Sequence, residues 1–390
     1  MLKACALSTL GALAIFQSPA LGMDDDSTDD STREAWVAAR DQVERALLDD
    51  AAGRWWNEES TSLKLSAQVQ TRYLYNTRSA DPDGRITSGF EARRTKLKAT
   101  GKLGDPRIRF VMVTAFSRST GLAVTEDVYA RFELADHWQL KVGKFRPSMM
   151  REQIISSKYQ MASDRSLLNS AFGQSYNEGV SLMYRAQRVR ASFSIMDATS
   201  TFVGDQIFDY TLRADFMLAG DRSQMSDFAS FRDDEPATML GFGVRYLDTN
   251  PTNPADPSSS TLAWSADLTA EFGGSSVFLA IMGTQVDDPG GPAAADLFGT
   301  LIQGGYFVND KTELFARYTH GDDQAGKSLN LVEVGANYYI ARHSAKITCD
   351  LGYSFEEVTT TWRSASLGWL TDTVGEEGQL VFRTQMQFLF

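Results

Sequence analysis

The sequence is poor in the residues that build most covalent and metal sites. Of its 390 residues, two are cysteine and three are histidine. Cys5 lies in an N-terminal segment that we expect to be cleaved, so Cys349 stands alone and no disulfide can form within the mature chain. No cluster of cysteine and histidine suits a metal ion, and no glycine-rich phosphate loop precedes a helix. We therefore expect neither a metal nor a cofactor.

An excess of basic residues and long apolar runs are also missing. Lysine and arginine number 38 against 50 aspartate and glutamate, which gives a net charge of −12. A nucleic-acid binder needs a basic surface, so we expect no nucleic-acid partner. After the N-terminal segment, no run reaches the ~18 apolar residues of a membrane-spanning helix. Mean hydropathy is −0.27 while aromatic residues reach 11%, which suits a chain whose apolar residues are spread over many half-buried strands.

Residues 1–22 have the organisation of an export signal. Lys3 gives a positive start, "ACALSTLGALAIF" (4–16) is a short apolar segment, and small residues follow up to Gly22. This order is typical of a signal peptide with cleavage after Ala20 or Gly22. A buried N-terminal helix is the alternative.

Residues 23–61 follow as an acidic tail and a short helix on the periplasmic side. The tail "MDDDSTDD" covers 23–30, and Ser31 with Glu34 forms a capping box that predicts a helix over 31–52. The helix is too short to form a domain. It either self-associates as a short coiled coil or lies against the main body of the protein.

From Ser62 to the end of the chain, apolar and polar residues alternate with a period of two, which predicts β-strands. The segments are of roughly ten residues, the length that a tilted strand needs to cross a bilayer. We expect about sixteen strands, at 62–76, 89–103, 107–116, 124–135, 138–145, 176–186, 188–198, 207–218, 237–248, 261–272, 276–286, 296–308, 312–319, 329–341, 345–356 and 379–390.

The connections between these segments alternate in length, which is the pattern of an outer-membrane barrel. The short set comprises 104–107, 135–137, 186–188, 272–276, 309–311 and 341–344. The long polar set comprises 77–88, 147–175, 249–260, 287–295, 320–328 and 357–378. Residues 220–235 are an exception, because they are long where a short turn is expected. A soluble sandwich would show the same alternation along its strands, but not the export signal, the strand length and the two classes of connection together.

We therefore predict an all-β fold, a transmembrane antiparallel barrel over residues 62–390 surrounded by outer-membrane lipid. A closed barrel has no free edge, so the last strand must pair with the first. Phe390 then lies at the periplasmic interface, where aromatic girdles occur. A terminal aromatic on the last strand is also typical of proteins read by the barrel-assembly machinery, so we expect Phe390 to act as a membrane-assembly signal.

Three neighbouring segments carry a specific pattern: "GFEARRTKLKATGKL" (89–103), "DVYARFELADHWQLKVGKFRP" (127–147) and "REQIISSKYQMASDRS" (151–166). Together they resemble the phosphate-selective porin O and P family over about 75 residues. The pattern is an Arg pair, a hairpin ending in Gly–(Gln/Lys)–Phe–(Lys/Arg)–Pro, a Glu, a Ser-Ser-(Lys/Arg)-Tyr and an Arg-Ser. The matching residues are Arg93, Arg94, Gly143, Lys144, Phe145, Arg146, Pro147, Glu152, Ser156, Ser157, Lys158, Tyr159, Arg165 and Ser166.

The resemblance implies a sixteen-stranded barrel, usually a homotrimer, that passes small anions passively through the outer membrane of a Gram-negative-type bacterium. It also implies that the loop 147–175 folds into the lumen and narrows it. The constriction residues would then be Arg146, Arg151, Glu152, Lys158, Tyr159 and Arg165.

Alternation assigns the faces of the wall. Arg94, Lys96 and Lys98 should point inward, because a charge on the lipid face costs about 2–4 kcal/mol at mid-bilayer. Arg93 then falls on the outer face, as does Glu126, which interrupts an apolar set that includes Val128. The other basic residues expected inside are Arg107, Arg109, Arg131, Lys141, Arg185, Arg190, Arg213, Arg317, Lys346 and Arg383. The acids expected inside are Asp127, Glu133, Asp209, Asp215, Glu313, Glu333 and Asp350.

A net basic lumen favours anions, since rings of Lys and Arg attract them into a pore. We expect small anions as solutes, with phosphate and polyphosphate as candidates. The alternative for the loop cations is that they pair with wall acids and only hold the loop in place. The alternatives for the protein are a general or carboxylate-preferring porin on the same fold, and a structural outer-membrane protein anchored through the helix 31–52.

The histidines do not support an enzyme. A hydrolase would need a nucleophile and a base on one patch. His137 and His343 lie in predicted turns at one end of the barrel, and His320 lies at the opposite end. We expect no catalytic residues.

Overall fold

The computed structural model describes residues 61–78, 86–147, 149–198, 208–249, 259–287, 296–324 and 326–390. The predicted signal peptide, acidic tail and helix 31–52 lie outside these residues. Within the described part, no helix has the length and apolar character needed to cross a membrane.

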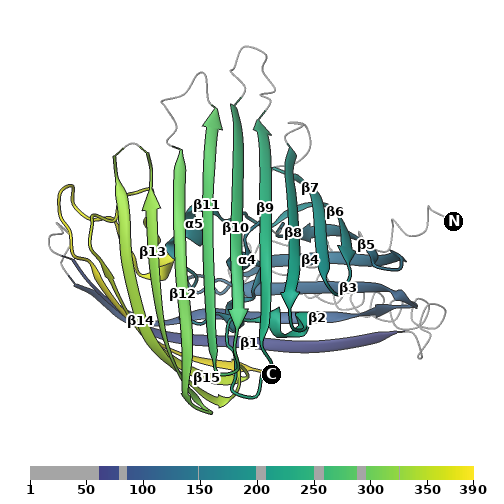
Figure 1. Cartoon of the computed structure of the whole chain (residues 1–390), viewed down its shortest axis with the longest axis horizontal. Coiled ribbons are helices and arrows are strands. Elements are labelled where there is room, and N and C mark those ends of the chain that lie inside the picture. The colour runs from purple at the N-terminus through teal and green to yellow at the C-terminus, as the bar shows by residue number, and fades with distance from the viewer. Residues whose placement is uncertain are drawn as a thin grey trace, which may run out of the picture. The chain divides into compact units, whose positions relative to one another are not determined.

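Sixteen antiparallel strands form one closed barrel in which each strand pairs with its neighbours in sequence (Figure 1). The predicted barrel of about sixteen strands is confirmed, with boundaries close to those expected. The strands are β1 (Ser62–Thr77), β2 (Ile86–Leu103), β3 (Asp105–Phe116), β4 (Ala123–Ala135), β5 (Trp138–Phe145), β6 (Asn177–Arg185), β7 (Val189–Asp197), β8 (Phe208–Ala219), β9 (Ala237–Thr249), β10 (Ser259–Glu271), β11 (Ser275–Asp287), β12 (Leu297–Asn309), β13 (Thr312–Asp322), β14 (Ser328–Ala341), β15 (Ala345–Ser354) and β16 (Leu380–Leu389).

The barrel closes through the pairing of its first and last strands. β16 runs antiparallel to β1 from Leu389 opposite Gln68 to Leu380 opposite Thr77. Phe390 extends this pairing, because its backbone N–H and C=O each exchange a hydrogen bond of 3.0 Å with Ala67. The Phe390 side chain is 76% exposed, on the same outward face as Phe388. The last aromatic residue therefore completes the seam of the barrel.

The two faces of the wall differ as the alternation predicts. In β16, Phe382, Met386 and Phe388 are exposed on the outer face, whereas Arg383 and Gln387 are buried inside. Large apolar residues stay exposed on the outer face of nearly every strand, from Leu65 in β1 to Phe388 in β16. A monomeric soluble protein rarely exposes so large an apolar area, so this surface suits lipid.

Three connections fold into the barrel. The loop 146–176 enters from the end that carries the long connections, here called the loop end, with the short helices α4 (Arg151–Ile154), η2 (Ser157–Tyr159) and α5 (Leu167–Phe172). The loop 355–379 enters from the same end with η4 (Ala365–Leu367). The segment 220–236, with η3 (Arg222–Ser226), enters from the opposite end, here called the turn end. We name these segments the long loop, the last loop and the floor segment.

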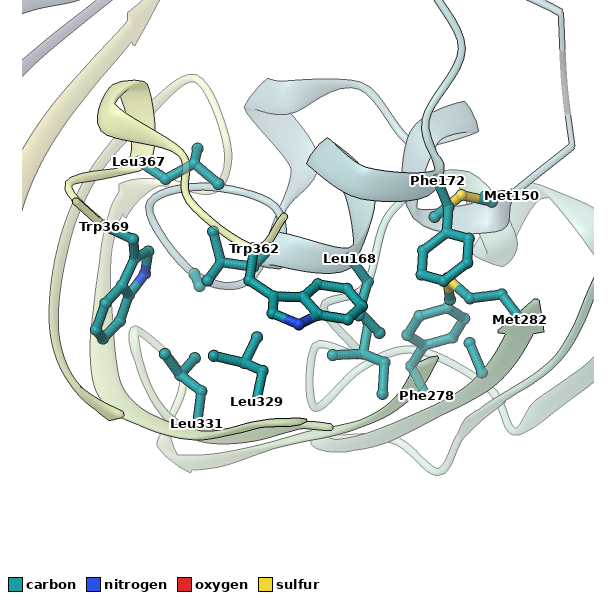
Figure 2. Packing of buried hydrophobic residues seen from close by; sticks show 14 of the residues in the cluster. Met150, Leu168, Phe172, Phe278, Met282, Leu329, Leu331, Trp362, Leu367 and Trp369 are labelled. Carbon is teal, nitrogen blue, oxygen red and sulfur yellow. The ribbon is translucent and has the colours of Figure 1, made fainter. Parts of the chain in front are cut away.

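The long loop and the last loop pack together as an apolar core inside the barrel. Trp362 and Trp369 of the last loop are each 1% exposed. Figure 2 shows Trp362 beside Leu168 of α5, with Leu329 of β14 close to them. The core also contains Phe278 of β11. These residues explain why both connections are buried inside the barrel. The family resemblance implied this position for the long loop, whereas the last loop was predicted only as a polar connection.

The floor segment explains the one long connection at the turn end. Arg222 donates hydrogen bonds to the backbone carbonyls of Gln187 and Arg188 in the β6–β7 turn. Further along, the Phe231 ring packs on Phe307 of β12 and Tyr339 of β14 at centroid distances of 5.0 and 5.1 Å. The burial of apolar side chains therefore explains why this connection is longer than the other turns at this end and folds into the barrel.

The long loop is attached to the wall through its own carbonyl groups. Asn337 of β14 donates to the carbonyl of Met161 (2.9 Å), and Lys346 of β15 donates to that of Gln160 (2.8 Å). Side chains of β8, β10, β13 and β16 bind other carbonyls of the loop in the same way. The loop thus lies against the β8–β16 half of the wall, and the open space is left along β1–β5.

Candidate functional site

A cavity of about 730 Å³ lies between the long loop and the wall formed by β1–β5. Nine basic side chains line it: Arg93, Arg94, Lys96, Lys98, Arg131, Lys141, Arg146, Lys158 and Arg165. Only two carboxylates line it, those of Glu126 and Asp127. The protein as a whole is acidic, so the charge of this cavity is opposite to that of the chain.

A row of like charges crosses the wall at the turn-end side of this cavity. Lys102 of β2 lies opposite Arg109 of β3. Arg109 lies opposite Arg131 of β4, and Arg131 lies opposite Lys141 of β5. Like charges directly opposite each other destabilise a sheet. Four adjacent cations therefore do not serve the stability of the barrel.

A second pair of this kind follows on the next two strands. Arg185 of β6 lies directly opposite Arg190 of β7. The Arg185 guanidinium donates to the side-chain oxygen of Gln139 (3.3 Å), which is neutral. The basic character of the cavity thus continues around the wall toward the turn end.

Three lysines of the cavity form no ion pair with a carboxylate of the described residues. Among the described residues, no acceptor lies within hydrogen-bonding distance of the ammonium groups of Lys98, Lys141 and Lys158. The ammonium of Lys141 lies over the ring of Phe145 at 3.8 Å, and that of Lys158 over the ring of Tyr159 at 5.0 Å. Aromatic rings hold cations in place without cancelling their charge.

Two arginines of the long loop are fixed in the cavity by neutral groups. Arg146 lies over the ring of Tyr176 at 4.2 Å. Arg165 donates to the backbone carbonyls of Glu152 (2.8 Å) and Ile155 (2.6 Å). Both guanidiniums therefore keep their positive charge where they line the cavity.

Two β-bulges change the faces that strict alternation predicts. The pairing of β1 with β2 shifts between Gln70 and Thr71, so that Arg93 has no opposite residue. The pairing of β3 with β4 shifts between Val113 and Thr114, so that Glu126 has none. The prediction that Arg93 and Glu126 face outward is wrong, because an extra residue in a strand breaks the period of two. Both side chains line the cavity instead.

The inward carboxylate at one bulge partly offsets the basic wall. The Lys96 ammonium lies 2.5 Å from the Glu126 carboxylate, which also accepts a hydrogen bond from the Tyr176 hydroxyl at 3.2 Å. Glu126 therefore neutralises one cation of the cavity. The sequence pattern did not predict this pair, because alternation placed Glu126 on the outer face.

Arg151 and Glu152 of the long loop have structural contacts outside the cavity. Arg151 donates to Thr269 Oγ1 (2.7 Å) and to the carbonyl of Met225 (3.0 Å) in the floor segment. Glu152 accepts the backbone N–H of Ser166 (2.6 Å) and its hydroxyl (2.7 Å). The structure therefore separates these two residues from Lys158, Tyr159 and Arg165, which do line the cavity.

The remaining basic residues expected inside the barrel divide into two groups. Arg107 and Arg109 lie toward the turn end; Arg107 pairs with Asp105 (2.7 Å), and Arg109 lies 3.5 Å from Glu133. Neither lines the cavity. In the β8–β16 half of the barrel, arginines face inward but form ion pairs with carboxylates. The pairs are Arg213 with Asp267 (2.6 Å), Arg317 with Glu333 (2.5 Å) and Arg383 with Asp350 (2.5 Å).

Tyr129 and Tyr176 line the cavity as well and were missed by the reasoning from charge. Tyr129 follows Asp127 at the spacing of one face of a strand, which was the available signal. Tyr176 lies at the end of a long loop, where no periodicity points to its direction.

The histidines remain apart, with His137 in the β4–β5 turn, His343 in the β14–β15 turn and His320 in β13. Within the described ranges, no three His, Cys, Asp or Glu side chains converge as a metal site would require. The lining of the cavity consists mainly of cationic, polar and aromatic side chains.

Known structures share this architecture at low sequence identity. OmpT, an outer membrane protein of Vibrio cholerae, matches in its trimer form with a TM-score of 0.58 and 12% identity, covering 84% of this chain and 100% of OmpT. The anion-selective porin of Comamonas acidovorans matches with a TM-score of 0.58 and 11% identity, covering 85% and 100%. The outer membrane channel DcaP of Acinetobacter baumannii matches with a TM-score of 0.53 and 11% identity, covering 85% and 99%. At such identities the likeness shows the fold alone.

No curated protein sequence matches this chain. The family described as phosphate-selective porin O and P matches residues 64–353, well over half of the chain and nearly the whole barrel. The chain therefore belongs to the phosphate-selective porin O and P family and is an outer-membrane channel protein of Gram-negative bacteria.

Proposed function

We propose that the protein is a channel for the passive diffusion of small anions. The observation that carries the proposal is the cavity lined by nine basic side chains and two carboxylates. A solute that leaves bulk water loses hydration, and fixed charges of opposite sign compensate that loss. The positive charge of the cavity therefore lowers the electrostatic free energy of chloride, phosphate and other small anions there. It raises that of potassium and sodium.

The path continues from the cavity toward the turn end. In the row of Lys102, Arg109, Arg131 and Lys141, the last two line the cavity and the first two lie beyond it. The pair of Arg185 and Arg190 lies on the next two strands. Mutual repulsion within such a row falls when an anion lies beside it. The row therefore does not stabilise the fold, but it can attract anions that pass along the wall.

Among anions, the arrangement favours oxyanions. Arginine presents a planar set of donors that matches the oxygens of phosphate or carboxylate. We propose phosphate and polyphosphate as solutes, with Arg94, Lys96, Lys98, Arg131 and Lys141 of the wall and Arg146, Lys158, Tyr159 and Arg165 of the long loop as the lining of the constriction.

The test is block of the chloride current through single channels in a planar bilayer. Phosphate is added at constant ionic strength, and a monocarboxylate such as acetate is added in a parallel series. Stronger block by phosphate than by acetate supports the phosphate preference proposed here. Equal block by both would favour a general or carboxylate-preferring porin, and block by neither would overturn the oxyanion preference.

The anion preference should decline as the pH is raised, in part through Lys158. Burial, together with the ammonium of Lys64, lowers the pKa of Lys158. A lysine is charged below its pKa, so Lys158 loses its charge at a lower pH than a free lysine and the cavity loses a cation. The reversal potential in a KCl gradient, followed through the alkaline range, measures this loss. Lys158→Arg keeps the charge and should show a smaller decline; an equal decline in both proteins would contradict the role of Lys158.

We also propose that the protein is a homotrimer, as the trimer form of OmpT from Vibrio cholerae with the same fold suggests. Chemical cross-linking in outer membranes, followed by electrophoresis, should yield a three-chain species as the largest product. A product of one chain alone would contradict the trimer.

A further inference from the structure

Three guanidiniums converge on one carboxylate at the edge of the cavity. Asp164 of the long loop binds Arg72 of β1 and Arg94 of β2 through short ion pairs. Arg93 donates through Nε to Oδ2 (3.1 Å) and lies with Nη2 3.1 Å from Oδ1, which is a two-point fork. The side chains of Asp164 and Arg72 are fully buried, whereas those of Arg93 and Arg94 keep 14% and 11% exposure and line the cavity.

The position of this carboxylate is also set by strands on the other side of the β1–β16 seam. Arg317 of β13 donates to the backbone carbonyl of Asp164 (2.9 Å). The backbone N–H of the preceding Ser163 donates to Asp350 Oδ2 of β15 (3.0 Å). Strands β13 and β15 thus hold the loop backbone so that the Asp164 side chain reaches the arginines of β1 and β2.

The carboxylate stays ionised in this place. Burial alone would raise the pKa of Asp164, but the guanidiniums of Arg94, Arg93 and Arg72 outweigh burial and hold the pKa well below its usual range. Asp164 is therefore a permanent anion at neutral pH. Its own oxygens do not line the cavity, so a solute contacts Arg93 and Arg94 rather than Asp164.

A carboxylate held by arginine forks is chemically equivalent to a permeating oxyanion at the same forks. Arg72 also pairs with Glu91, so without Asp164 the guanidiniums of Arg93 and Arg94 are the ones left free to hold an oxyanion tightly. A channel requires binding that is favourable enough for an ion to enter but weak enough for it to leave. A carboxylate of the protein that binds some of the guanidinium N–H groups leaves fewer of them for the permeating oxyanion. The lining can then be strongly basic and still release the oxyanion quickly.

We propose that Asp164 is a built-in counter-anion that weakens the binding of permeating oxyanions to the Arg93–Arg94 pair and so sets how quickly they leave. Asp164 does not touch the solute; it is a positioning and charge-setting residue that acts through the two arginines. The proposal rests on the anion-channel function proposed above and names the element that limits affinity in it.

The test compares the wild type with Asp164→Asn, which keeps the size of the side chain and removes its charge. The readout is the phosphate concentration that halves the chloride current of single channels, together with the dwell time of each phosphate block. One additional net positive charge at the arginine pair should lower that concentration by about tenfold and lengthen the dwell time similarly.

A structural control separates charge from anchoring. Asp350→Asn removes the carboxylate that holds the neighbouring Ser163 and does not touch Arg93 or Arg94. If Asp164 only anchors the loop, both variants should change the channel in the same direction, with weaker phosphate block. If the counter-anion account holds, Asp164→Asn alone strengthens the block.

A second variant protects the test against misfolding. Asp164→Asn with Arg72→Met removes one buried charge of each sign, and Glu91, the other partner of Arg72, keeps its ion pair with Arg118. Arg93 and Arg94 are left without Asp164, so this variant should also strengthen phosphate block. Unchanged or weaker block in both Asp164 variants would overturn the proposal. Failure of the underlying function is distinguishable, because a wild-type channel without anion preference would be seen before any variant is compared.

Discussion

Replacing Arg131 and Lys141 together by glutamate should convert the channel from anion preference toward cation preference. The two residues lie directly opposite each other on β4 and β5 and line the cavity. The double change alters the local charge by four units. Each unit acts on an ion at ~8 Å with about 0.5 kcal/mol in water, so the double change disfavours an anion by about 2 kcal/mol and favours a cation by the same amount. The ratio of anion to cation permeability should therefore fall by about a thousandfold.

The reversal potential in a KCl gradient measures this ratio directly. Lys144→Gln is the matched control, because Lys144 lies on the same strand but pairs with Glu178 (3.1 Å) on the outer face. It should leave the reversal potential unchanged. The same shift in the control, or no shift in the double variant, would contradict a wall that selects by charge.

Replacing Arg383 by methionine should destabilise the interior of the barrel more than any change of an exposed charge. Arg383 is fully buried, binds Asp350 at 2.5 Å and also pairs with Glu333. It donates to the carbonyl of Leu367 in the last loop (3.0 Å) as well. Removing one partner leaves buried carboxylates uncompensated, which costs about 3–5 kcal/mol.

The measurement is the temperature at which the folded barrel in detergent loses its compact mobility on a gel, together with proteolysis of the last loop. Arg383→Met should lower that temperature and speed cleavage within 355–379. Arg107→Met is the control, because its ion pair with Asp105 is exposed and such pairs contribute about 0–1 kcal/mol. Equal unfolding temperatures for both variants would show that the inner network does not hold the loops.

The strands and their order follow from the sequence because a barrel wall obeys local rules. Alternation places Phe388 and Gln387 on opposite faces wherever the chain lies in the sheet, and short turns force neighbouring strands to pair. Closure through β1 and β16 then follows, since a membrane barrel leaves no edge unpaired. These features need no knowledge of distant contacts.

The bulges and the interior do not follow from the same rules. One extra residue at Arg93 and one at Glu126 reverse the faces of their neighbours, and nothing in the strand pattern marks them. Apolar residues in the connections were an available signal: Trp362 and Trp369 in the last loop and Phe231 in the floor segment have no place on a solvated loop. Their burial partners lie far away in sequence, so only the structure identifies them.

The parity of a residue gives its face but not its surroundings. Arg131 and Arg383 both point inward, yet Arg131 lines the cavity while Arg383 is ion-paired with two carboxylates. The difference arises because the long loop, the last loop and the floor segment fill one half of the barrel and leave the other half open. Which cations are available to a solute therefore depends on where those three segments lie.

The reversal potential of the wild-type channel in a KCl gradient tests the central claim most directly. Purified protein in a planar bilayer should give single-channel currents that reverse close to the equilibrium potential of chloride, because the cavity presents nine cations and two carboxylates to the permeating ion. Reversal close to the equilibrium potential of potassium would contradict an anion path through the basic cavity.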